Sequence, residues 1–227
     1  MADGALVSTA AAIDAAVRAR AMLSHPFYLA WSAGELPLNV LRDYARQYFH
    51  HVEAFPRAVS AVHSNCPDRD GRFLLAENLA EEEGLGAGKD DHASLWLAFA
   101  EGLGASEADV RDAALLAQTS ALVETFKRLS RQSYAAGLGA LYAYESQLPQ
   151  VASTKIAGLE QFYGIQDART IHFFKVHEHA DIEHAAVCRD LLDRLPPGQR
   201  EEACAAGEEL AGALWAFLDG METLRAA

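Results

Sequence analysis

One stretch of the sequence, FFKVHEHADIEHAAVCRDLL at positions 173–192, constrains the fold more than any other. At the roughly 100° per residue of an α-helix, His177, Asp181 and His184 fall within one narrow sector of the helix surface. Apolar residues share that sector at steps of three and four, namely Phe173, Ala180, Val187, Cys188 and Leu191. An apolar stripe on a helix faces the core, so the pattern predicts a helix that buries two imidazoles and a carboxylate.

Other charged residues of this stretch fall on the opposite side of the same helix. His179 and Glu183 point away from the apolar stripe, where water can solvate them. A ladder of ion pairs on the surface is the competing interpretation of EHADIEH. The apolar residues that share the face of His177 favour burial instead.

The rest of the chain also favours helices. Ala, Leu, Glu and Arg dominate, all four favour helix, and no convincing stretch alternates with the period of two that marks a strand. Residues that typically begin or end helices, such as capping residues, glycine and proline, predict about eight helices. They are expected at residues 8–23, 38–63 with a kink at Pro56, 68–83, 90–101, one ending near 135, 137–163, one around the opening stretch, and one at the C-terminus. Long helices with short connections indicate an all-α bundle, which we expect to form one domain over residues 1–227.

Composition and charge limit the possible partners and location. The chain has 227 residues, 51% of them hydrophobic, which is enough to build a core. A net charge of −13 argues against nucleic acids and anionic membranes as partners, and no apolar run is long enough to cross a bilayer. The first twenty residues lack the basic region of a signal peptide. Cys66, Cys188 and Cys204 are too few and too widely spaced for a disulfide framework, so we expect a cytoplasmic protein.

The same test of periodicity finds a buried carboxylate in another predicted helix. Glu145 lies in the middle of an apolar stripe formed by Leu138, Leu141, Tyr142 and Leu148. A lone buried carboxylate is costly unless it is paired or bound to a metal. Glu145 therefore needs a partner from elsewhere in the chain.

Two further candidates follow from the helices around residues 68–83 and 90–101. Glu82 continues the inner face set by Leu75 and Leu79, although Glu81 and Glu83 flank it and remain alternatives. A histidine, His92, opens the next helix ahead of the apolar residues Leu95, Trp96 and Phe99.

Together these candidates have the composition of a metal centre. Three imidazoles and three carboxylates suit iron or manganese better than structural zinc. Six ligands suit two metal ions with one bridging carboxylate, and helical bundles build such sites from facing helices. The candidates are Glu82, His92, Glu145, His177, Asp181 and His184. A single buried His or Glu is more often a hydrogen-bonded core residue, and His50, His51 and His63 are weaker candidates for ligands.

Four segments, YARQYFHHVEAFPRAVSAVHSNC, LLAENLAEEEG, ALYAYESQLP and HEHADIEHA, together resemble the CADD family, named for association with death domains. That family belongs to the heme-oxygenase-like proteins, near PqqC and the TenA group. The resemblance runs from about residue 25 to residue 219 with the segments in the family's order. It implies a bundle of seven or eight helices, usually a homodimer, which binds two metal ions, either two irons or a manganese and an iron, and uses dioxygen.

The resemblance also implies the ligands one by one. The family's first glutamate falls on Glu82, its next histidine on His92 and its YES glutamate on Glu145. Its H-x3-D-x2-H motif falls on the three residues of the opening stretch. The link EGLGAGKDD looks a few residues longer than the family norm, which leaves Glu81 or Glu83 as alternatives to Glu82.

CADD-like proteins are linked to the formation of p-aminobenzoate for folate from one of their own tyrosines. The resemblance implies that Tyr28 in HPFYLAW supplies the ring and Lys155 in VASTKIAGL supplies nitrogen, with Tyr44 and Tyr142 lining the same pocket. Such a protein would turn over once. From the residues alone, Tyr28 would be an ordinary core aromatic and Lys155 a lysine facing solvent.

Other functions are compatible with the same fold. A dimetal oxidase that acts on an external small molecule would use the same centre. A metal-free oxidase of the PqqC type would not need the carboxylates. A thiaminase-like enzyme needs a nucleophilic cysteine, whereas Cys188 lies one turn past His184 and looks structural.

Overall fold

The structure, a computed structural model, describes residues 8–86 and 89–226. Residues 1–7, 87, 88 and 227 lie outside the described residues. They include part of the N-terminal segment and part of the EGLGAGKDD link. Every regular element within the described residues is a helix, which confirms the predicted all-α class.

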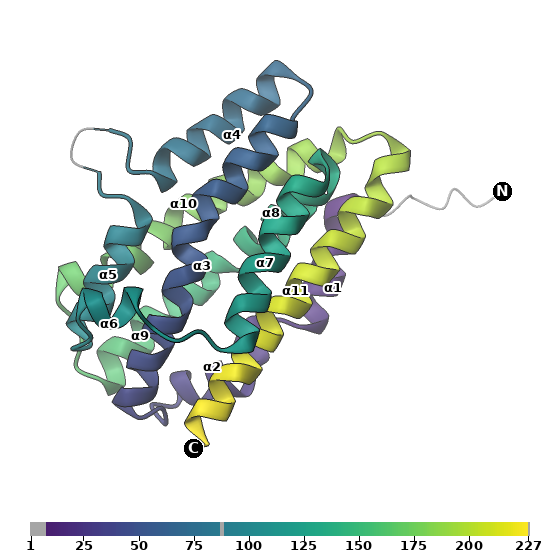
Figure 1. Cartoon of the computed structure of the whole chain (residues 1–227). Helices are drawn as coiled ribbons and strands as arrows, with labels where there is room; N and C mark the ends of the chain where they lie inside the picture. Colours follow the sequence, from purple (N-terminus) through teal and green to yellow (C-terminus); the bar gives the residue numbers. More distant parts are fainter. Residues whose placement is uncertain (1–7, 87–88, 227) are drawn as a thin grey trace.

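Figure 1 shows the helices in their order along the chain. They are α1 (Thr9–Ala19), a short 3-10 helix η1 (Met22–Ser24), α2 (Pro26–Ser32), α3 (Leu38–Asn65), α4 (Arg69–Glu82), α5 (His92–Gly102), α6 (Glu107–Arg111), α7 (Ala117–Gln132), α8 (Tyr134–Glu145), α9 (Leu148–Phe162), α10 (Ala168–Asp193) and α11 (Pro197–Arg225). None of these helices is both long and apolar enough to cross a membrane.

The described helices outnumber the eight predicted, and local chemistry explains two of the differences. No helix was predicted between residues 23 and 38, but α2 forms there because His25 caps it through Nδ1 and Pro26 occupies its first turn. Proline is well suited to that position because the amide it lacks would be unsatisfied anyway. The predicted helix 137–163 is instead two helices, because the chain turns at Ser146–Gln147 and Pro149 opens α9.

Two groups of helices surround the centre of the molecule. The C-terminal helix α11 packs against α8, α7 and α1, while α10 packs against α9, α5 and α8. Contact between α8 and α11 is unusually close at Gly139, where a Cβ atom would lie 2.1 Å from the carbonyl oxygen of Ala203. The helix α8 can therefore lie deep in the bundle, with its last residue, Glu145, fully buried.

Candidate metal centre

The helix α10 buries the face that its periodicity predicts. His177, Asp181 and His184 are only 5%, 2% and 7% exposed. His179 and Glu183 are exposed, as predicted. The six ligand candidates come from four helices, α4, α5, α8 and α10.

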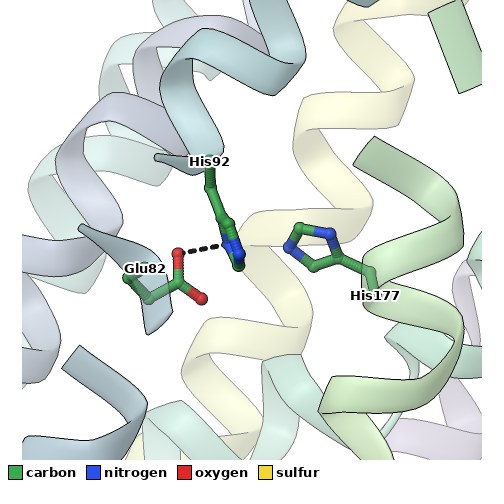
Figure 2. A group of neighbouring side chains, drawn as sticks. All are labelled: Glu82, His92 and His177. Carbon is green, nitrogen blue, oxygen red and sulfur yellow. Dashed lines mark ion pairs between the residues drawn. The ribbon is translucent and has the colours of Figure 1, made fainter. Parts of the chain in front are cut away.

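Glu82, His92 and His177 form the first group of potential ligands. Each offers one ligand atom, and these atoms all lie within 4.8 Å of one another. Figure 2 shows the three side chains directed toward a common point. Of the alternatives to Glu82, Glu81 is partly exposed and Glu83 is exposed, so the structure brings Glu82 into this group.

The chain reversal between α4 and α5 places Glu82 beside His92. Gly84 adopts a φ of +65°, a backbone conformation that glycine reaches without steric cost. A Cβ atom there would lie 2.5 Å from the backbone nitrogen of Asp91. Asp91 then caps α5 by accepting a hydrogen bond from the Ser94 amide, which makes His92 the first residue of the helix.

Glu145, Asp181 and His184 form the second group, again with ligand atoms within 4.8 Å of one another. Glu145 is 0% exposed. Burial raises the pKa of Glu145 and of Asp181, and the charge of Glu82 in the first group raises both values further, so the two groups interact electrostatically. The six candidates therefore divide into two sets of three, each of which could hold a metal ion.

Buried atoms without hydrogen-bond partners test whether these groups fit metal ions. Among the described residues, His92 Nδ1, Asp181 Oδ2 and His184 Nδ1 are buried and have no such partner. His92 Nδ1 lies 2.7 Å from Glu82 Oε2 but without the geometry of a hydrogen bond. Nearly all buried polar atoms in proteins are hydrogen-bonded, so unpaired potential ligand atoms in both groups fit bound cations.

Hydrogen bonds outside the two groups orient the ligands. His177 donates through Nδ1 to the carbonyl oxygen of Phe173 at 2.7 Å, which leaves its Nε2 free. His184 Nε2 lies 3.1 Å from Glu81 Oε2, which leaves its Nδ1 facing Asp181 at 3.5 Å. Metal-binding histidines are commonly fixed in this way through their second nitrogen.

Glu145 is held by two residues that the sequence analysis did not assign to the centre. Asn78 donates to Oε1 at 2.7 Å, and the Cys188 thiol donates to Oε2 at 3.2 Å. Asn78 lies one turn before Glu82 on α4, so its position on the inner face was the available signal. Cys188 supports a carboxylate, and burial raises its pKa well above the usual thiol value, which disfavours a nucleophilic role.

Without metal, the centre holds protons in place of cations. Burial raises the pKa of Asp181 to about 7, and nearby carboxylates contribute to the shift. Burial alone would lower the pKa of His184, but Asp181 and Glu145 together raise it to about 9. Burial and the neighbouring His92 lower the pKa of His177 well below its usual value, so this ring is neutral. Cations that displace these protons would restore the carboxylates to their charged state.

A second buried polar cluster contains Tyr28, Tyr44 and Lys155, which are 2%, 0% and 3% exposed. The Tyr28 and Tyr44 hydroxyls are 3.1 Å apart, and Lys155 Nζ donates to the Tyr44 hydroxyl at 2.6 Å. Burial lowers the pKa of Lys155 well below its usual value. The lysine is therefore a buried amine among aromatic rings and does not face solvent.

The structure places Tyr142 apart from this cluster, contrary to the expectation that it lines the same pocket. Its hydroxyl donates to Asp14 at 2.7 Å and also contacts Arg189. Another pair of tyrosines, Tyr48 and Tyr144, takes the place next to Tyr44, with their hydroxyls 2.9 Å apart.

Tyr48 and Tyr144 extend the cluster of Tyr28, Tyr44 and Lys155. The rings of Tyr44 and Tyr48 are stacked at 5.5 Å between centroids, and Tyr144 directly precedes Glu145. The sequence analysis did not select either tyrosine, although Tyr48 follows Tyr44 by one helical turn. His51 packs edge-on against Tyr144 at 4.7 Å and belongs to neither group of potential ligands.

Comparisons with known proteins agree with this geometry. The sequence model of a family described as iron-containing redox enzymes matches residues 42–217. The 4-aminobenzoate synthase of Nitrosomonas europaea is 40% identical over 221 residues, covering 92% of this chain and 89% of that protein. A solved CADD-like protein of unknown function from Nostoc punctiforme aligns with a TM-score of 0.76 at 19% identity, covering 95% of this chain and 99% of that one.

A solved domain of unknown function from Shewanella denitrificans has a heme oxygenase-like fold. It aligns with a TM-score of 0.71 at 18% identity, covering 95% of this chain and 89% of that domain. The predicted heme-oxygenase-like fold and the resemblance to the CADD family are thereby confirmed.

Proposed function

Because the chain belongs to the iron-containing redox enzyme family, we propose that it forms 4-aminobenzoate from its own Tyr28. The product is the one named for its relative from Nitrosomonas europaea. The observation that carries the proposal is the buried cluster in which Tyr28 and Lys155 share the Tyr44 hydroxyl as hydrogen-bond partner.

The chemistry of the product matches the two side chains. 4-Aminobenzoate and tyrosine share a benzene ring with substituents at opposite ends. The conversion replaces the phenol oxygen, which leaves as water, by the nitrogen of Lys155, whose Nζ–Cε bond must break. It also breaks the Cα–Cβ bond and oxidises Cβ to the carboxyl carbon, with dioxygen as the oxidant. The Tyr28 hydroxyl, which must be replaced, is the end of the ring that faces Tyr44 and the Lys155 amine.

Burial prepares Lys155 to donate nitrogen. An ammonium ion has no lone pair, whereas desolvation lowers the pKa of Lys155 and so favours its neutral amine. Its Nζ lies 5.4 Å from the centre of the Tyr28 ring. Both reactants belong to the same chain, so they are held together without a binding step.

The candidate metal centre would provide the oxidising power. Two iron ions, or one manganese and one iron, would supply the activation of dioxygen that no amino-acid side chain can provide. Glu82, His92 and His177 would hold one ion. The other three candidates would hold the second.

Tyr48 and Tyr144 provide a path between the oxidised ring and this centre. Phenols can lose an electron and a proton together, and the hydroxyls of these two tyrosines are paired at 2.9 Å. Stacking of Tyr44 on Tyr48 continues the series to Tyr28. We propose that electrons leave Tyr28 by this route, while protons move within the hydrogen-bonded pairs Tyr28–Tyr44 and Tyr48–Tyr144.

The test is the substitution Tyr28→Phe. It removes one hydroxyl, so the expected loss of stability is about 1 kcal/mol, with metal content unchanged. We expect no 4-aminobenzoate from this variant by mass spectrometry, and no more than one molecule per chain from the wild type. Tyr163→Phe is the matched control, because the Tyr163 hydroxyl has no hydrogen-bond partner among the described residues.

A different outcome would favour a different enzyme. Many turnovers per chain with Tyr28 intact would identify an oxidase that acts on an external small molecule. In that case Tyr28→Phe would leave activity close to the wild-type value.

A further inference from the structure

Three cavities in the described part of the chain border residues of the proposed metal centre. A groove of about 540 Å³ reaches Asp181. A cavity of about 460 Å³ reaches His92, and a smaller one of about 180 Å³ between α4 and α10 reaches His184. Any of the three could connect the buried ligands with solvent. The charged residues that line each one indicate which would attract a metal cation.

The two larger openings are electrically balanced. The charged residues that line the groove, apart from Asp181 itself, are Asp14, Arg18, Arg189 and Asp190. Those that line the cavity at His92, apart from its histidines, are Glu81, Lys89, Asp90 and Lys175. Each opening thus has as many basic as acidic side chains.

Of the Asp, Glu, Lys and Arg side chains, only glutamates line the small cavity. Glu77, Glu81 and Glu183 surround it, and no lysine or arginine lines it. Glu77 and Glu183 are exposed and form no ion pair within the described residues. Glu81 pairs with Lys89 at 3.5 Å, but that lysine is outside the lining.

Polar atoms continue from this acidic mouth to the ligands. Asn78 lines the cavity, is 4% exposed, and its Oδ1 has no hydrogen-bond partner among the described residues. Its amide nitrogen holds Glu145. His184 lines the cavity too, and its unpartnered Nδ1 faces the second group of ligands. The buried Asn78 Oδ1, which has no hydrogen-bond partner among the described residues, could bind a cation that moves through the cavity.

We infer that the cavity between α4 and α10 is the route by which divalent metal ions enter the centre. The inference rests on the proposed metal centre. Three carboxylates outnumber the one histidine in the lining, which contains no lysine or arginine, so they attract divalent ions and raise their local concentration. The cavity could hold about six water molecules, so an ion could retain part of its hydration shell. Asn78 Oδ1 then offers an oxygen on the way to Glu145.

The experiment measures manganese uptake by the full chain after its metal has been removed with a chelator. Loss of the free Mn²⁺ signal in electron paramagnetic resonance gives the rate and the final number of ions bound. The variant combines Glu77→Gln with Glu183→Gln, neither of which is a proposed ligand. At low ionic strength we expect uptake about tenfold slower than in the wild type, and the difference should vanish at high salt. The final number of ions per chain should be unchanged.

The control combines Asp90→Asn with Asp190→Asn. It removes the same net charge from the other two openings, so its uptake rate should stay close to the wild-type rate. A second variant, Leu74→Trp, places a large ring at the acidic mouth and should slow uptake at high salt as well.

Each remaining outcome has a definite meaning. Normal stoichiometry with an unchanged rate in the double glutamine variant overturns this route alone. Equal slowing in the asparagine control overturns it as well, because the rate would then follow net charge. Wild-type protein that binds no manganese overturns the metal centre itself.

Discussion

Lys155 has an unusual environment for a lysine, because its amine is buried among aromatic rings. Six aromatic rings lie within 5.9 Å of its Nζ, and no carboxylate pairs with it in the described structure. Burial lowers the pKa of Lys155 in the folded chain. At a pH between that lowered value and about 10.4, Lys155 is protonated in the unfolded chain and neutral in the folded chain. Stability must therefore rise with pH in this range.

Lys155→Met tests both the charge and the function of this residue. Above the lowered pKa of Lys155 and up to about pH 10, the wild-type free energy of unfolding should rise, with Lys155 contributing up to about 1.4 kcal/mol per pH unit. The Met variant should lose that contribution, measured by urea unfolding at each pH. It should also form no 4-aminobenzoate, although metal content should stay at the wild-type level. Equal slopes in the two proteins would mean that Lys155 is charged when folded.

Glu145→Gln tests the second group of ligands. The amide keeps the shape of the side chain but loses its charge, and it can no longer accept from both Asn78 and Cys188. We expect metal content to fall from two ions to about one per chain by elemental analysis, because only the group of Glu82 stays intact. Glu183→Gln, on the exposed face of α10, should keep both ions. Two tightly bound ions in Glu145→Gln would contradict the proposed ligand assignment.

Residue positions show how far sequence reasoning reaches. Periodicity alone selected the six residues that the structure brings together, because a polar side chain in an apolar stripe is a local signal. Lys155 and Tyr28 gave no such signal, since a lysine near solvent or a tyrosine in a core is ordinary. Tyr48, Tyr144 and Asn78 were missed because their roles depend on contacts between helices distant in sequence.

Among helices, the type of each element was more predictable than its ends. The inner face of α10 follows from the spacing of its apolar residues. The break between α8 and α9 depends on Pro149, which opens α9 and which the sequence alone does not distinguish as a break. Gly137 and Gly139 suggested a helix beginning, but Ser133 caps α8 earlier. These glycines lie inside α8 because neighbouring helices approach closely there, which no local pattern reveals.

Gly139→Ala tests this approach of α8 to α11. The added methyl would lie 2.1 Å from the Ala203 carbonyl oxygen, so the two helices must separate. We expect a loss of stability of roughly 1–3 kcal/mol by urea unfolding. Gly198→Ala is the control, since nothing lies within 4 Å of its added carbon and alanine favours helix. A Gly139 variant as stable as the wild type would show that the backbones can relax apart.

Across the whole molecule, the proposed metals would join helices α4, α5, α8 and α10. A ligand that binds only the folded chain stabilises it by about 2.7 kcal/mol at a hundred times its dissociation constant. For a chain of this size that corresponds to a rise in melting temperature of roughly 5–10 °C. Manganese added to metal-free protein at pH 8 should produce such a rise by calorimetry, and chelator should reverse it.

The size of that rise should depend on pH in a definite direction. Protons compete with metal at the centre, where the metal-free pKa of Asp181 is about 7 and that of His184 about 9. Binding must release these protons, so affinity falls as pH falls. We expect the manganese-induced rise to shrink steadily from pH 8 to about 5.5 and to be smaller in Asp181→Asn at every pH, because only the group of Glu82 then stays intact. A rise that stays constant over this range would mean that the stabilising ions bind elsewhere, because carboxylates on the surface remain ionised throughout it.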